Sequence, residues 1–212
     1  MTIPAIADAV ALIRAGQTEK ALNLLEAAIP DLPPEARQEA RKYAGLACYF
    51  AERWPEALAY FTAVAEESAI PEDHFNVAMS LVKLGEIEPA HTAWERVFTL
   101  SYEHQDAPES SSFFEKKLLF ARALLDARAP DPRGLDLVGR QLMGFYTTNH
   151  ITDPGFWGMR RVPDFESVLV ATREFYRGMG KPEAEWGAYL DGIVGQLDEE
   201  GRALAEGMRG YT

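Results

Sequence analysis

Apolar residues follow a helical spacing on both sides of a proline in the stretch from Ser80 to Phe98. Upstream, the residues that share one helix face are Phe75, Ala78, Met79 and Val82; downstream they are Ala90, Trp94, Val97 and Phe98. Proline is tolerated in the first turn of a helix but breaks a helix interior, so Pro89 predicts the start of a second helix. Gly85 lies between the two runs, where a helix commonly ends. The stretch therefore predicts a helix hairpin.

Two earlier stretches repeat this hairpin, with Gly16 as the break in the first and Pro55 near the start of a helix in the second. Five columns agree across the three copies: a small residue (Ala9, Gly45, Ala78), an apolar one (Leu12, Cys48, Leu81), an alanine (Ala21, Ala57, Ala90), a large apolar one (Leu25, Phe61, Trp94) and a smaller one (Ala28, Val64, Val97). The alanines are 36 and then 33 residues apart. Small residues suit close helix crossings, and bulky ones fill the gap between them.

This interval and its columns resemble the tetratricopeptide repeat, over three copies in about residues 2 to 104. The closest piece to the family pattern is the run from Asn76 to Gly85. The chain departs from the pattern early in the first helix of each copy, where Ala5, Arg41 and His74 replace a large residue. Three unrelated hairpins in a bundle are the alternative interpretation.

Downstream of residue 105 the repeat pattern weakens. A helix after Ser112 and a partner over Leu135 to Phe145 predict a fourth, degenerate hairpin. Residues 146–163 have no clear period, and two helices follow: one over about 163–179 and a long one with an apolar stripe over 182–208. We expect an all-α protein, a right-handed superhelical array of antiparallel hairpins with a helical C-terminal extension. Its predicted parts are residues 1–105, 106–146 and 147–212.

Composition and charge narrow the classes of function. The 212 residues are 47% apolar, and 33 acidic against 21 basic residues give a formal charge of -12, which disfavours a general nucleic-acid binder. Cys48 is the only cysteine, so we expect no intrachain disulfide and no cysteine-cluster metal site; its column predicts a buried, inert thiol. We expect no signal peptide, no membrane span, no cofactor and a cytoplasmic location.

The family resemblance implies that the first helix of each repeat lines a concave groove in which partners bind. The predicted groove residues are Lys42, Leu46, Tyr49, Phe50, Phe75, Met79, Val82 and Lys83, with Ile3, Ile6, Val10 and Ile13 from the first copy. So apolar a groove predicts contact with an external peptide or helix, or with the chain's own C-terminal region. The expected function is a protein-binding scaffold, adaptor or chaperone-like module rather than an enzyme.

Two other classes of function remain open. A self-associating structural protein would form a homodimer through the 182–208 stripe. An enzyme would place its site in residues 146–163, where the candidates are His150, Asp153, Trp157, Arg160 and Arg161. For the two arginines we expect internal ion pairs in so acidic a chain. Asp198, Glu199 and Glu200 are interpreted as the solvated face of the last helix, and the histidines lack the spacing of a metal-binding pair.

Overall fold

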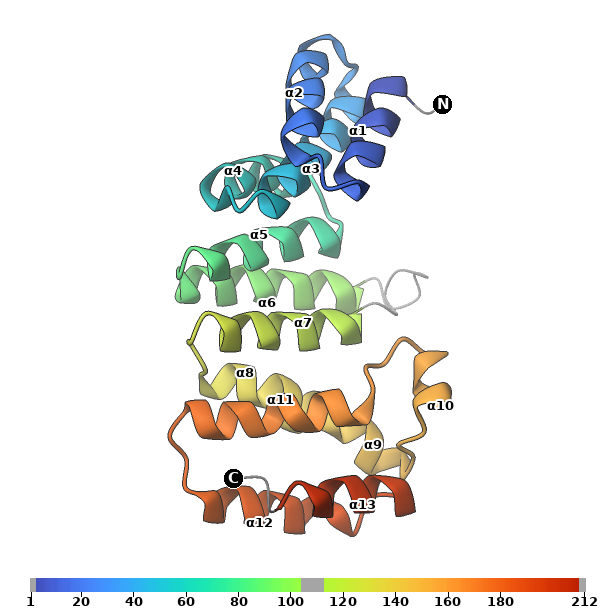
Figure 1. Cartoon of the computed structure of the whole chain (residues 1–212), viewed down its shortest axis with the longest axis vertical. Helices are drawn as coiled ribbons and strands as arrows, with labels where there is room; N and C mark the ends of the chain where they lie inside the picture. Colours follow the sequence, from blue (N-terminus) through green and yellow to red (C-terminus); the bar gives the residue numbers. More distant parts are fainter. Residues whose placement is uncertain (1–2, 104–112, 210–212) are drawn as a thin grey trace. The chain divides into compact units, whose positions relative to one another are not determined.

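A computed structural model describes residues 3–103 and 113–209 of the chain (Figure 1). These residues form helices joined by turns, and no strand occurs among them. The chain divides into two compact units, unit 1 over Met1–Glu103 and unit 2 over His104–Thr212. The prediction of an all-helical protein is therefore confirmed for the described residues. The predicted boundary at 105/106 lies outside them.

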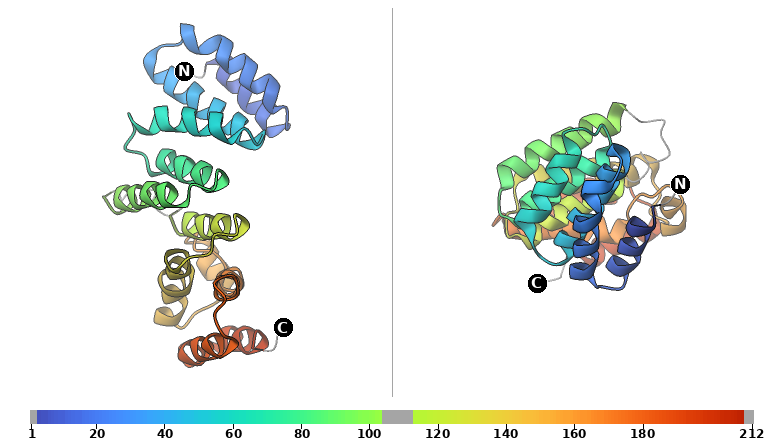
Figure 2. Two further views of the ribbon diagram at one scale, coloured as in Figure 1. Left: turned by 90° about the vertical axis from the view of Figure 1, so that its left-hand side faces the viewer. Right: turned by 90° about the horizontal axis from the view of Figure 1, so that it is seen from above.

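Unit 1 contains six α-helices in three consecutive pairs (Figures 1 and 2). The helices are α1 (Pro4–Arg14), α2 (Thr18–Ala28), α3 (Pro34–Phe50), α4 (Trp54–Ala65), α5 (Pro71–Lys83) and α6 (Ile87–Glu103), with a 3-10 turn η1 (Ile29–Asp31) after α2. Each helix packs against the next one along the chain, and α1 also contacts α3. Pro55 and Pro89 lie in the first turns of α4 and α6, where a missing N–H costs nothing. The prediction that a second helix starts near each of these prolines is thus confirmed.

The turn inside each pair has the same backbone conformation three times. One residue adopts a left-handed φ: 72° at Gly16, 60° at Glu52 and 76° at Gly85. The next backbone N–H then donates to a carbonyl five residues back, from Gln17 to Leu12, Arg53 to Cys48 and Glu86 to Leu81, each at 2.9 Å. This is the 6→1 bond of a Schellman helix end. The sequence interval of 36 and 33 residues therefore corresponds to a repeated structural unit.

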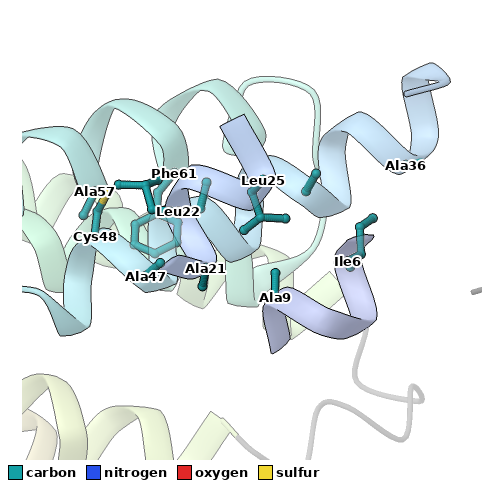
Figure 3. Close-up of a cluster of buried hydrophobic side chains, with 12 residues drawn as sticks. Ile6, Ala9, Ala21, Leu22, Leu25, Ala36, Ala47, Cys48, Ala57 and Phe61 are labelled. Atoms are coloured by element: carbon teal, nitrogen blue, oxygen red, sulfur yellow. The ribbon is translucent and has the colours of Figure 1, made fainter. Parts of the chain in front are cut away.

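The alanine column occupies one structural position in all three pairs. Ala21, Ala57 and Ala90 are each the fourth residue of the second helix of their pair, and each has an exposed fraction of 0%. Ala21 and Ala57 belong to the core shown in Figure 3, together with Leu25 and Phe61. The small side chain lets two helices approach closely at this point, as the sequence pattern predicts.

Cys48 lies in the same core with no exposed surface. Burial raises the pKa of its thiol to about 11, although the nearby Arg53 opposes the shift. Because the thiolate is the reactive form, a raised pKa and full burial make this cysteine inert. The prediction of a buried structural cysteine is confirmed.

Unit 2 is built around one long helical run. Its elements are α7 (Phe113–Asp126), α8 (Pro132–Asp136), the π-helical segment η3 (Leu137–Leu142), α9 (Met143–Asn149), α10 (Pro154–Gly158), α11 (Phe165–Gly178), α12 (Glu183–Val194) and α13 (Glu199–Gly207). The helices α7, α8, α9 and α11 all contact η3. The predicted partner helix over Leu135 to Phe145 is present but longer, since α8, η3 and α9 continue from 132 to 149. Because α11 contacts α7, α8 and α9, the segments divided at 146/147 in the sequence analysis belong to one unit.

The prediction of one long helix after residue 182 is wrong, because the chain breaks between α12 and α13. Asp198 caps α13 by accepting the N–H of Gly201 at 2.9 Å. Its carboxylate also accepts the N–H and the hydroxyl of Thr152, at 2.6 and 2.5 Å. Asp198 is therefore not part of a solvated helix face: aspartate is among the strongest N-cap residues, and here it also joins two distant segments.

Candidate binding surface

The predicted groove residues divide into buried and accessible side chains. Phe75 and Val82 have exposed fractions of only 7% and 1%, so they support packing and present almost no surface to a partner. Leu46, Tyr49 and Met79 are half-buried, and Leu46 and Tyr49 pack against the core of Figure 3. Phe50 is 61% exposed, and Lys83 is exposed as well. The accessible part of the predicted groove thus includes the C-terminal ends of α3 and α5.

Aromatic side chains cluster around the end of α3. The ring of Tyr49 meets Phe50 edge-on, with centroids 6.1 Å apart, and meets Trp54 edge-on at 4.9 Å. The ammonium of Lys83, at the end of α5, lies 5.8 Å from the Trp54 ring centroid. We call Tyr49, Phe50, Trp54 and Lys83 the Phe50 patch. Half-buried Tyr49 and Trp54 fix its position, and Phe50 presents most of its ring to solvent.

Local sequence explains why Phe50 points outward. It is the last residue of α3, and the chain reverses at Glu52 through the left-handed conformation before α4 begins at Trp54. The ring therefore has no following helical turn to cover it. Sequence reasoning missed Trp54, which stands outside the repeat columns; its position directly before Pro55, at the predicted helix start, was the available signal.

Lys42 has a different role from the one predicted. Its ammonium lies 2.7 Å from a carboxylate oxygen of Asp73 on α5, and Asp73 is buried. The hydroxyl of Ser68 donates to the other oxygen of Asp73 at 2.6 Å. Lys42 thus neutralises a buried carboxylate of its own chain, and removing it would leave that charge uncompensated. A side chain engaged in this way is a poor candidate for orienting a partner.

A pocket of unit 1 is lined by polar residues, most of which are paired. It is an open pocket bounded by Glu26, Arg41, Arg53, Glu56 and Tyr60, with Ala59 and Ala63. Arg53 faces Glu56 at 3.1 Å and Glu19 at 3.4 Å, and the Tyr60 hydroxyl donates to Glu26 at 2.9 Å. Burial, with Glu26 adding to it, raises the pKa of Tyr60 to about 12. Because Arg53, Glu56 and Tyr60 already have partners, the pocket is a weaker candidate than the Phe50 patch.

The five residues considered for an enzyme site have separate structural roles. The indole N–H of Trp157 donates to the Ile151 carbonyl at 2.7 Å, and Asp153 caps α10 by accepting the N–H of Phe156 at 2.5 Å. The Nδ1 atom of His150 lies 2.6 Å from the Gln196 carbonyl. These three contacts order the segment between α9 and α11, and each of them is made with a different backbone group.

Arg160 and Arg161 do not form the predicted internal ion pairs: within residues 3–103 and 113–209, no carboxylate lies within ion-pair distance of either. The Arg160 guanidinium instead stacks 3.9 Å from the Phe156 ring centroid, a cation–π contact.

The apolar stripe over 182–208 is covered within unit 2. Trp186, Leu190 and Leu197 are buried, and Trp186 stacks on Tyr189 with centroids 5.4 Å apart. The Tyr189 hydroxyl donates to the Gly139 carbonyl at 3.0 Å, and its burial raises the pKa of the phenol. A dimer formed through these side chains would have to remove them from their own core. The apolar stripe that suggested a homodimer is therefore explained by packing inside unit 2.

We also searched the described residues for metal sites and membrane-spanning helices. Among these residues, no three His, Cys, Asp or Glu side chains are placed to hold a metal ion, and no helix is both long and apolar enough to cross a bilayer. Comparison with protein-family models, with curated proteins and with solved structures gives no match for this chain.

Proposed function

We propose that the protein is a protein-binding module that holds an apolar segment of a partner against the Phe50 patch. In this proposal the three helix pairs of unit 1 are a tetratricopeptide-like, right-handed array. The threefold repetition of the left-handed turn and of the buried alanines supports that assignment. The function is that of a scaffold, adaptor or chaperone-like protein, without catalysis.

The observation that carries the proposal is the 61% exposure of Phe50 beside half-buried aromatic rings. An aromatic side chain contributes about 200 Å2 of surface, so about 120 Å2 of Phe50 stays in water. At about 25 cal/mol per Å2, covering it with a partner would contribute up to about 3 kcal/mol. Tyr49 and Trp54 are already held in place, so little side-chain entropy is lost when a partner binds there.

The test is a peptide selection against the purified full chain. Peptides recovered from a displayed library are synthesised, and their Kd values are measured by fluorescence anisotropy for the wild type and for Phe50→Ser. We expect the substitution to weaken binding at least about ten-fold, which corresponds to about 1.4 kcal/mol of the contact estimated above. Circular dichroism of the variant checks that its helices are intact.

Ile70→Ser is the matched control, because Ile70 is another exposed apolar side chain of unit 1, with an exposed fraction of 52%. It precedes α5, whereas Lys83 ends that helix, so it lies about 20 Å from the patch along the helix axis. Ile70→Ser should leave the Kd unchanged. If the selected peptides bind wild type, Phe50→Ser and Ile70→Ser equally well, the patch is not a binding site and the proposal fails.

A further inference from the structure

Negative charge is concentrated in the unit that carries the Phe50 patch. Residues 1–103 contain 16 acidic and 8 basic side chains, a formal charge of -8, while residues 104–212 contain 17 acidic and 13 basic ones, a formal charge of -4. A partner approaching unit 1 therefore meets a negative field before it makes any contact. Such a field speeds the association of a positively charged segment and slows that of a negatively charged one.

Two glutamates lie close to patch residues along the chain. Glu52 lies two residues after Phe50 and two before Trp54, and Glu86 lies three residues after Lys83. Both are exposed. Within the described residues, no lysine or arginine lies within ion-pair distance of either carboxylate. By contrast, Glu56 in the same region is paired with Arg53 at 3.1 Å. The carboxylates of Glu52 and Glu86 can therefore form ion pairs with lysine or arginine side chains of a partner.

The backbone fixes where one of these charges is placed. Glu52 adopts the left-handed conformation that glycine occupies at the equivalent positions 16 and 85. In this second pair, the turn therefore carries a charged side chain at a position where the other two pairs have no side chain at all. Along the chain, Glu52 lies between Phe50 and Trp54, two positions from each.

We infer that the Phe50 patch binds a cationic amphipathic segment: a large apolar side chain covers Phe50, and flanking lysines or arginines face Glu52 and Glu86. This inference rests on the proposed function and adds the chemical class of the partner. Within the patch, the Trp54 ring already accepts a cation, the Lys83 ammonium, so the patch itself shows a cation next to an aromatic ring. Exposed ion pairs are each worth about two- to five-fold in affinity, so two of them give roughly ten-fold.

The probes are three synthetic peptides of about 18 residues, long enough to form a helix, with one shared Leu/Phe face. Their polar faces carry lysine, glutamine or glutamate. Fluorescence anisotropy with the full chain should give the tightest Kd for the lysine peptide and the weakest for the glutamate peptide. The difference should shrink between about 50 and 300 mM NaCl, because salt screens exposed charges. Equal affinity for the lysine and glutamine peptides at low salt would overturn the inference.

Paired charge variants separate the site from the general field. Glu52→Gln with Glu86→Gln should weaken the lysine peptide about five- to ten-fold and leave the glutamine peptide unchanged. The control is Glu35→Gln with Glu39→Gln, which removes the same charge from two exposed positions in the N-terminal half of α3, about 16–22 Å from Phe50 along the helix. If both double variants weaken the lysine peptide equally, only the net charge matters, and the assignment to Glu52 and Glu86 is wrong.

Phe50→Ser distinguishes a failure of this inference from a failure of the proposed function. If it weakens all three peptides alike while charge has no effect, the patch binds apolar segments without selecting cationic ones. If it weakens none, the proposed function itself fails. Sedimentation velocity of the chain alone tests for self-association. If the chain assembles in a concentration-dependent way and Phe50→Ser abolishes this assembly, the patch binds a second copy of this acidic chain, and the inference of a cationic partner is wrong.

Discussion

In the second helix pair, a buried glycine packs against a phenylalanine ring at positions where the first pair has alanine and leucine. Substituting both residues tests whether they share one packing site. Gly45 on α3 is buried, and a Cβ added there would lie 2.6 Å from Cε1 and 2.7 Å from Cδ1 of Phe61. Phe61 is 1% exposed, so its ring has little room to move away. At the equivalent positions the first pair has Ala9 and Leu25, both with 0% exposure. Between these two pairs, glycine accompanies the ring and alanine accompanies the smaller side chain, whereas the third pair combines Ala78 with Trp94.

Two opposing terms determine the cost of Gly45→Ala. Overpacking a tight core costs about 1–3 kcal/mol, and a carbon at 2.6 Å from an enclosed ring belongs near the upper end. Alanine in a helix interior is favoured over glycine by about 1 kcal/mol, which offsets part of that cost. We expect a net destabilisation of about 1–2 kcal/mol. Phe61→Leu alone removes buried carbon and should cost about 1–2 kcal/mol as well.

The double variant Gly45→Ala with Phe61→Leu copies the Ala9 and Leu25 pair into the second repeat. Because the new methyl occupies space that the ring has left, the two changes should compensate. We expect the double variant to be at least about 1 kcal/mol more stable than the sum of the single changes. Native-state hydrogen exchange, resolved for peptides of α3 and α4, measures this free energy within unit 1. Additive effects within about 0.5 kcal/mol would refute the claim that the two positions share one packing site.

Three further variants test individual contacts by chemical denaturation. Glu52→Gly should stabilise unit 1 by about 0.5–1 kcal/mol, because φ is 60° there and only glycine adopts this region without strain; an unchanged or lower urea midpoint would contradict this. Lys117 is 6% exposed, and burial lowers its pKa from the ordinary 10.5 to about 8. Between pH 8 and 10.5 the unfolded chain therefore binds more protons than the folded one, so the stability of the wild type should rise with pH in that window. Lys117→Met should be up to about 3 kcal/mol more stable at pH 7, less any cation–π contact with the Phe113 ring, and should lack this rise. Asp198→Ala should cost about 2 kcal/mol in unit 2, since it removes the α13 cap and both bonds from Thr152. Burial opposes the shift, but the bonds from Thr152 and Gly201 leave the pKa of Asp198 lowered, so this contribution should be present near neutral pH and fade as acid protonates the carboxylate; a pH-independent effect would exclude that origin.

The sequence pattern was sufficient for the helix pairs of unit 1. Gly85 and Pro89 indicated the end of one helix and the start of the next, because glycine adopts a left-handed φ without strain and proline lacks the N–H that a helix interior needs. The alanine column identified equivalent buried positions, since helical periodicity places a residue on a given face of its own helix. The break before α13 was missed although it depends on a local cap: Asp198 was interpreted only as a charge on a helix, in a run whose apolar spacing continued on both sides of it.

The candidate site was predicted less well, for a physical reason. Lys42, Phe50 and Val82 belong to one predicted groove, yet Lys42 neutralises Asp73, Phe50 is exposed and Val82 is buried. Periodicity gives the direction of a side chain from its own helix axis, but its accessible surface depends on which other segments lie above it. Those neighbours are separated from it along the chain, as Thr152 and Asp198 are by 46 residues, and no local pattern records the pairing.

The amino-acid sequence by itself therefore determined where the helices of unit 1 pair and which small residues lie between them, because backbone preference and period are local. Only the tertiary structure decided that Phe50 remains uncovered beside Tyr49 and Trp54, and that Glu52 and Glu86 are exposed without an ion-pair partner among the described residues. Exposure and charge pairing are properties of surfaces formed by several helices together, and they are defined once those helices have packed.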